Sequence, residues 1–169
     1  MTFSRIAFIP FLIMGELQEK YFQSLMIILL ISMSDIVDGM VAKQVESSCK
    51  GGDIFDIAAD FMVVLSVFVL WYLKQMVSIY IIFLILLSFI TFGYISFLKK
   101  KITKNKIGKY VGAVCFLGIT VIIFTRLYFK KIYISSQNLV VIIISIYLII
   151  SIIENIRSII KEIRYEQKR

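Results

Sequence analysis

The chain has 169 residues, 60% of them hydrophobic, and a mean hydropathy of +0.92. Soluble domains are closer to half apolar, so this composition indicates a protein embedded in a membrane. The chain contains no histidine, which excludes Ser-His-Asp and Cys-His nucleophile systems and His-ligated zinc. Two cysteines are too few for a closed four-cysteine zinc site or a disulfide framework. Any chemistry must therefore come from carboxylates, lysines, arginines, hydroxyls and the metal ions they hold.

Six apolar segments are candidates for membrane-spanning helices, each of which needs about 20 mostly apolar residues. The first, 3–17, is short and contains Pro10; the others are 21–41, 55–73, 76–98, 110–129 and 139–160. A cleaved signal peptide is the alternative for 3–17, but Pro10 breaks its apolar run and no small-residue cleavage site follows. We expect one all-α integral membrane domain over 1–169, built as a single bundle of six transmembrane helices.

The basic residues predict how this bundle is oriented. Six spans place both termini on one side, and fourteen of the 19 lysines and arginines then fall on that side. The positive-inside rule therefore predicts cytoplasmic termini in an inner (cytoplasmic) membrane. Anionic lipid headgroups account for the net charge of +8, and we expect no nucleic-acid partner. Arg126, Lys130 and Lys131 fall on the far side, where we expect them to be anchors at the membrane interface.

All the aspartates of the chain lie close together in the sequence. Asp35 and Asp38 are expected at the cytoplasmic end of the second helix, and Asp56 and Asp60 at the start of the third. Spacings of three and four residues put each pair on one helix face. The short connection lets the pairs face each other across a helical hairpin. The fifth, Asp53, precedes the apolar run of the third helix and is expected to be its N-cap.

Four carboxylates at close range need protons or cations between them. Hard oxygen ligands without histidine or thiolate suit Mg²⁺, Mn²⁺ or Ca²⁺, and Mg²⁺ often completes its shell with substrate phosphate. The residues thus predict a two-metal phosphate site at the cytoplasmic membrane boundary; solvated helix-end acids are the alternative. Gly39, Ala42 and Gly52 allow a flat base or a diphosphate to approach the backbone, or simply allow close helix packing.

The motif residues together read Asp35-x2-Asp38-Gly39-x2-Ala42-Lys43-x8-Gly52-x3-Asp56-x3-Asp60. This pattern resembles the signature of the CDP-alcohol phosphotransferase family, Asp-x2-Asp-Gly-x2-Ala-Arg-x8-Gly-x3-Asp-x3-Asp. Every spacing fits, and the one departure is Lys43, where the family usually has arginine. The six-helix pattern is similar to the family's fold. Residues 2–6 and 108–114 are similar to the corresponding parts of bacterial phosphatidylglycerophosphate synthases.

The resemblance implies a reaction and a set of roles. A phosphatidyl group would pass from CDP-diacylglycerol to the hydroxyl of a small alcohol, with release of CMP, and the enzyme would be a homodimer. Two Mg²⁺ or Mn²⁺ ions would be the cofactors. The positions that match metal ligands are Asp35, Asp38, Asp56 and Asp60, the last also matching the general base. The positions that match the nucleotide pocket are Gly39, Ala42, Lys43 and Gly52.

The acceptor alcohol is a separate question. A sugar or polyol phosphate needs cations near the metals, and the candidates are Lys109, at the opening of the fifth helix, and Arg5, at the cytoplasmic end of the first. Glycerol 3-phosphate is the leading acceptor; inositol phosphate, serine or another alcohol are alternatives. The spacing of Gly108 and Gly112 fits either a helix contact or the acceptor pocket.

Two other classes of protein use intramembrane carboxylates. An intramembrane prenyltransferase also binds diphosphate through Asp-bound Mg²⁺, but it would need more spans and two separated acidic motifs. A small divalent-cation transporter would place its carboxylates near the bilayer midplane. The four motif aspartates are instead expected at one membrane face, so the pattern favours a phosphatidyltransferase.

Overall fold

The computed structural model describes residues 2–44, 52–98, 110–129 and 131–166, which form helices joined by short turns. The helices are α1 (Thr2–Leu17), α2 (Tyr21–Gln44), α3 (Gly52–Leu73), α4 (Ile79–Leu98), α6 (Val111–Tyr128) and α7 (Tyr133–Glu166). This arrangement of the described residues confirms the predicted all-α class and the prediction of six helices.

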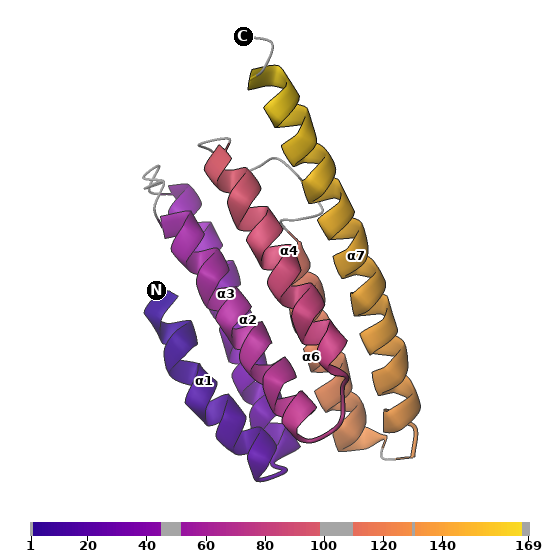
Figure 1. Cartoon of the computed structure of the whole chain (residues 1–169). Helices are drawn as coiled ribbons and strands as arrows, with labels where there is room; N and C mark the ends of the chain where they lie inside the picture. The colour runs from indigo at the N-terminus through magenta and orange to yellow at the C-terminus, as the bar shows by residue number, and fades with distance from the viewer. Residues whose placement is uncertain (1, 45–51, 99–109, 130, 167–169) are drawn as a thin grey trace.

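The helices alternate in direction along the bundle (Figure 1). The end of α2, the start of α3 and the start of α6 lie at one end, which we name the motif end because it carries the aspartates. The turns 18–20 and 74–78, the end of α6 and the start of α7 lie at the other, the turn end. At the motif end α7 extends beyond the other helices, because its 34 residues are about 50 Å long.

Three helix starts, those of α3, α4 and α7, differ from the sequence prediction by three residues or more. α4 begins at Ile79, three residues later than expected, because the end of α3 is closed by a turn in which Gln75 has a positive φ of 56°. α7 begins at Tyr133, six residues earlier than its apolar run. Its polar first turns include Gln137, which is buried. Asp53 lies in the first turn of α3 and not at its N-cap, since α3 already begins at Gly52.

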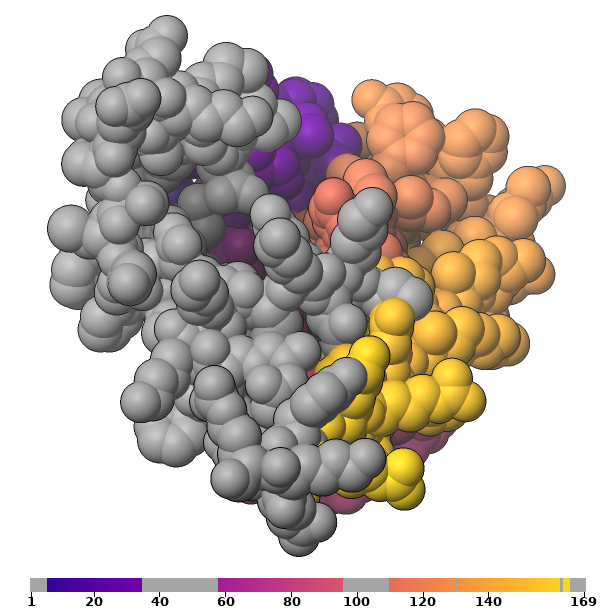
Figure 2. Space-filling model, turned by 90° about the horizontal axis from the view of Figure 1, so that it is seen from above, coloured from indigo at the N-terminus to yellow at the C-terminus, as the bar shows by residue number. Residues whose placement is uncertain are grey.

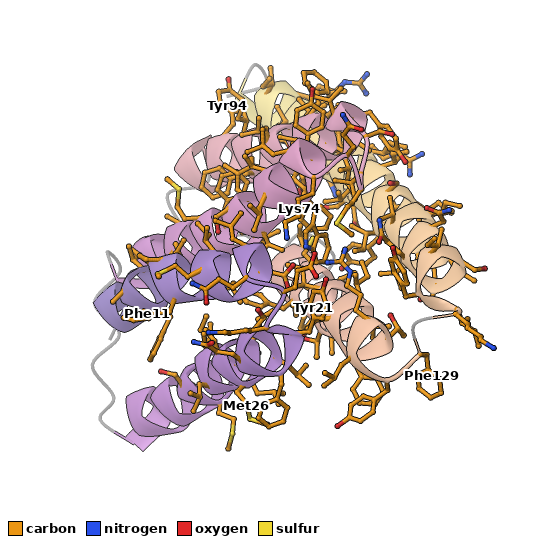
Figure 3. The ribbon with its side chains drawn as sticks, turned by 90° about the horizontal axis from the view of Figure 1, so that it is seen from below. Phe11, Tyr21, Met26, Lys74, Tyr94 and Phe129 are labelled. Carbon is orange, nitrogen blue, oxygen red and sulfur yellow. The ribbon has the colours of Figure 1, made fainter. Side chains whose placement is uncertain are left out.

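The helices pack around a shared apolar core. α1 packs on α2 and α3, α4 packs on α3 and α7, and α6 contacts α2, α3 and α7. The largest fully buried side chains include Phe68, Trp71 and Ile122. Many outward side chains are also apolar, among them Phe11, Met26 and Phe129, which point away from the bundle in Figure 3. An apolar exterior of this extent suits contact with lipid.

Two helices in the described part of the chain contain a segment long and apolar enough to cross a membrane, Val111–Tyr128 and Tyr133–Lys161. In the other four helices the described side chains cover apolar stretches of 10–17 residues: Ile6–Leu17, Tyr21–Ser34, Ala58–Leu73 and Ile79–Ile95.

Gly118 lies where α6 packs closely against α7. A Cβ at this position would overlap Ile144 Cδ1 and lie 3.2 Å from Val140 Cγ1. We therefore expect Gly118→Leu to destabilise the fold by about 1–3 kcal/mol or more through overpacking. Gly93→Leu is the matched control, because a Cβ at Gly93 meets nothing within 4 Å. The check is unfolding in SDS mixed micelles followed by circular dichroism; equal stability of the two variants would contradict this packing.

Candidate active site and a second polar cluster

The structure brings both halves of the aspartate motif to the motif end of the bundle. Asp35 and Asp38 lie in the second half of α2, which stays helical to Gln44, and Asp56 and Asp60 lie in the first turns of α3. The side chains of Asp35, Asp38 and Asp56 are outside the described part. Figure 2 looks onto this end, where the coloured side chains come mainly from α7 and the start of α6.

Asp60 is the motif residue whose side chain the structure describes. It lines a cavity of about 510 Å³ whose walls come from α2, α3, α4 and α6. Opposite it lies Gly112 in the first turn of α6, where an added Cβ would be 3.9 Å from Asp60 Cβ. A larger residue at this position would take up space beside the Asp60 carboxylate. Gly112 also lines the cavity, so the geometry fits both alternatives for this glycine, a helix contact and a place in the pocket.

The cavity below Asp60 is mainly apolar. Two of its hydroxyls are hydrogen-bonded within their own helices: Ser32 Oγ donates to Ile28 O at 2.9 Å, and Thr120 Oγ1 donates to Phe116 O at 2.8 Å. Phe61 and Phe89 stack in its wall with ring centroids 4.0 Å apart. A carboxylate at one side of an apolar cavity suits a ligand with a polar reacting group and an apolar remainder.

The other predicted site residues are placed by their helices. Gly39, Ala42 and Lys43 lie in the last turns of α2, and Gly52 is the first residue of α3. Arg5 lies in the first turns of α1, which packs on both motif helices, but its side chain is outside the described part. Lys109 lies outside the described residues altogether.

The described side chains contain no group of three that could hold a metal ion. Three of the four carboxylates predicted to bind metal are not among them, so the metal site remains a prediction. Its donor chemistry fits Mg²⁺ or Mn²⁺, since the motif supplies oxygen ligands alone from two helix segments at one end of the bundle.

A second polar cluster at the turn end was not predicted. Arg126 of α6 is 5% exposed and pairs with the fully buried Glu16 of α1, with Arg126 Nη1 3.3 Å from Glu16 Oε2. Trp71 of α3 donates from Nε1 to the same oxygen at 3.0 Å. Lys74 donates to the backbone oxygen of Glu16. The expectation that Arg126 is an anchor at the membrane interface is therefore wrong.

The same cluster extends to the start of α7. Arg126 Nη2 donates to Gln137 Oε1 at 3.3 Å, and Gln137 Nε2 donates to Met76 O at 2.5 Å. The guanidinium also lies over the rings of Tyr21, Trp71 and Tyr133, within 5.9 Å of each centroid. Seen from the turn end, Tyr21 and Lys74 point toward the middle of the bundle (Figure 3).

One signal in the sequence could have revealed this cluster. Glu16 and Arg126 are ionisable residues within apolar segments, and both fall near the same predicted membrane face. Ionisable groups inside membrane segments usually pair with each other. The pairing itself was not predictable, because 110 residues separate the two partners in sequence.

Comparison with known proteins identifies the class of enzyme. The CDP-alcohol phosphatidyltransferase family matches residues 1–153, which is most of the chain and includes the whole aspartate motif. The chain belongs to this family. It is therefore a member of a membrane-associated, generally divalent-metal-dependent family of phosphotransferases that transfer groups from CDP-alcohols. No curated protein and no solved structure matches the chain.

Proposed function

We propose that the protein transfers a phosphatidyl group from CDP-diacylglycerol to the hydroxyl of a small alcohol and releases CMP. The observation that carries the proposal is the position of Asp60, which is both the last residue of the family motif and part of a cavity wall inside the bundle. The apolar walls suit the lipid portion of such a substrate. The adjacent carboxylate suits the reacting polar end.

The four motif aspartates are the proposed ligands of two Mg²⁺ or Mn²⁺ ions. Asp35, Asp38 and Asp56 would hold the ions together with Asp60. When bound, the ions would neutralise the charge of the diphosphate and of the leaving CMP. No other described group of acids competes for this role, and the absence of histidine from the chain is compatible with an all-oxygen site.

Asp60 is the proposed general base. Its carboxylate accepts the proton of the acceptor hydroxyl as that oxygen bonds to the phosphorus on the lipid side. The bond from this phosphorus to the bridging oxygen breaks, and CMP leaves with the electron pair. A base is useful because a neutral alcohol is a weaker nucleophile than the same oxygen after its proton is removed. The glycine at 112 leaves space beside the carboxylate for the incoming hydroxyl.

Substrate contacts follow from the same motif. Gly39, Ala42, Lys43 and Gly52 are the proposed nucleotide-binding residues, with Lys43 offering a point charge where relatives usually have a guanidinium fork. Lys109 and Arg5 are the proposed contacts to an acceptor phosphate. Glycerol 3-phosphate is the leading acceptor, because residues 2–6 and 108–114 are similar to phosphatidylglycerophosphate synthases. Inositol phosphate, serine or another alcohol are the alternatives.

The membrane topology and the oligomeric state are also proposals. We propose one domain of six transmembrane helices over 1–169 that forms a homodimer in the inner membrane, with both termini and the motif end in the cytoplasm. The alternating helix directions support termini on a common side (Figure 1). The excess of basic residues on that side supports a cytoplasmic location. There a lipid tail can stay in the bilayer while CMP reaches water.

The direct test is CMP release by purified protein in detergent. The reaction contains CDP-diacylglycerol, Mg²⁺ or Mn²⁺, and one acceptor at a time from a panel of alcohols and alcohol phosphates. We expect release that depends on one acceptor and stops when EDTA removes the metal. Release without a metal, or no release with any acceptor from folded protein that binds the CDP-lipid, would contradict the proposal. Zinc in place of Mg²⁺ is the matched metal control, with no activity expected.

A further inference from the structure

The polar cluster at the turn end shares two helices with the proposed active site. Asp60 and Trp71 are eleven residues apart on α3, which is about 16 Å along the helix. Gly112 and Arg126 are fourteen residues apart on α6, or about 21 Å. Both helices run from the motif end to the turn end (Figure 1). The Asp60–Gly112 approach and the Trp71–Glu16–Arg126 contacts are therefore the two ends of one helix pair.

Near Asp60, part of the space between α3 and α6 is a cavity and is not filled by side chains. The cavity of about 510 Å³ lies between these helices and α2 and α4, and it runs along α6 from Val111 to Thr120. Toward the turn end the cavity stops, and buried apolar side chains such as Phe68 and Ile122 follow. Beyond them lies the polar cluster. Hydrogen bonds and ion pairs are directional, so this cluster specifies a geometry that apolar contacts leave adjustable.

The cluster is also costly as a purely stabilising element. Taking Glu16 and Arg126 out of water opposes folding, and such pairs are often no better for stability than apolar residues of similar size. Within the described part of the chain, Glu16 Oε1 and Arg126 Nε have no hydrogen-bond partner. Because these two buried atoms lack hydrogen bonds, the pair contributes even less to the stability of the fold. The stability of the fold therefore does not explain this buried pair, whereas a role in fixing the positions of the helices does.

We propose that Glu16 and Arg126 are positioning residues that join α1, α3 and α6 at the turn end and thereby set the distance between Asp60 and Gly112. The pair links α6 to α1 directly and to α3 through Trp71. Through Gln137 it also holds the start of α7. Without the pair, α3 and α6 can separate, and the Asp60 carboxylate then moves away from Gly112. The effect on catalysis rests on the proposed function; the effect on helix spacing does not.

The test compares helix spacing with and without the pair. The ideal Cβ of residue 112 is 3.9 Å from Asp60 Cβ, within the range a disulfide needs. The reporter protein is Asp60→Cys/Gly112→Cys with Cys49→Ser and Cys115→Ala. The pair is removed by Glu16→Gln/Arg126→Met, which leaves no buried charge and keeps an acceptor for Trp71. Disulfide formation is followed over time in detergent by the change in gel mobility after maleimide–polyethylene glycol labelling.

We expect rapid disulfide formation with the pair present and at least a fivefold slower rate without it. Phe129→Ala is the matched control at the same end of α6, where the side chain is about half exposed, and it should leave the rate unchanged. An unchanged rate without the pair would overturn the proposal. So would an equal slowing in the control, or a failure of residues 60 and 112 to bridge at all.

A kinetic measurement completes the test. In the chain without reporter cysteines, Glu16→Gln/Arg126→Met should lower kcat for CMP release at least fivefold, with little change in KM for the CDP-lipid. A merely structural role predicts normal kcat once the variant is folded. If the original protein releases no CMP, the proposed function fails and the disulfide rates still decide the positioning role.

Discussion

Asp60→Asn is expected to lower the rate of CMP release by about 10²- to 10⁴-fold, the range for loss of a positioned general base. The amide has nearly the shape of the carboxylate but cannot accept the proton of the incoming hydroxyl, and it is a weaker ligand for a divalent cation. Because Asp60 lines the cavity and lies beside Gly112, the variant should fold normally. The measurement is acceptor-dependent CMP release at saturating CDP-diacylglycerol, with circular dichroism as the check on folding.

Glu19→Gln is the matched control for that prediction. It also removes one carboxylate, but from an exposed residue in the turn between α1 and α2, at the end of the bundle away from Asp60. Its rate of CMP release should equal that of the unchanged protein. If Asp60→Asn kept more than about one tenth of the activity, the assignment of Asp60 as general base would be wrong.

Arg126→Met is expected to have the largest effect on stability, about 3–5 kcal/mol, the range for breaking a buried ion pair. The change leaves the carboxylate of Glu16 buried without its cation, and it also removes the contacts to Gln137 and Met76. Met has a similar length, so loss of packing is a small part of the effect. The check is the free energy of unfolding from titration with SDS in mixed micelles.

Adding Glu16→Gln to Arg126→Met should restore most of the lost stability. The second change removes the unpaired charge and keeps a side-chain oxygen that can accept from Trp71 Nε1. The comparison with the two single variants forms a double-mutant cycle, which isolates the coupling between the residues. Additive losses in the double variant would show that the charges do not act on each other.

Much of the architecture could be predicted because its signals are local. Runs of apolar residues separated by short polar turns marked six helices, and the structure contains helices in all six places. The clustering of every aspartate within 35–60 and their helical spacing marked the candidate site. The family match over residues 1–153 confirms the class of enzyme that this pattern indicated. Whether the four carboxylates bind metal stays a prediction.

The sequence predictions were wrong for residues that contact distant parts of the chain where contact with solvent or lipid was expected. The first turns of α7 are polar, so the apolar run alone places the start of this helix too late; Gln137 in these turns bonds to Arg126 and to Met76 O. Arg126 was expected at the interface and is buried instead. Close packing of α6 and α7 occurs at Gly118 and depends on the side chains of Val140 and Ile144. None of these partners is near in sequence, so no local pattern could reveal them.

The sequence by itself determined the helical class of this protein, the order of its helices and the chemistry of its motif. Those properties depend on residue type and on spacings within one or two turns of helix, which set hydrophobic periodicity and the choice of metal ligand. Only the tertiary structure decided that Asp60 adjoins an apolar cavity opposite Gly112 and that Glu16 pairs with Arg126. Both are contacts between helices, and they depend on how six helices pack together in three dimensions.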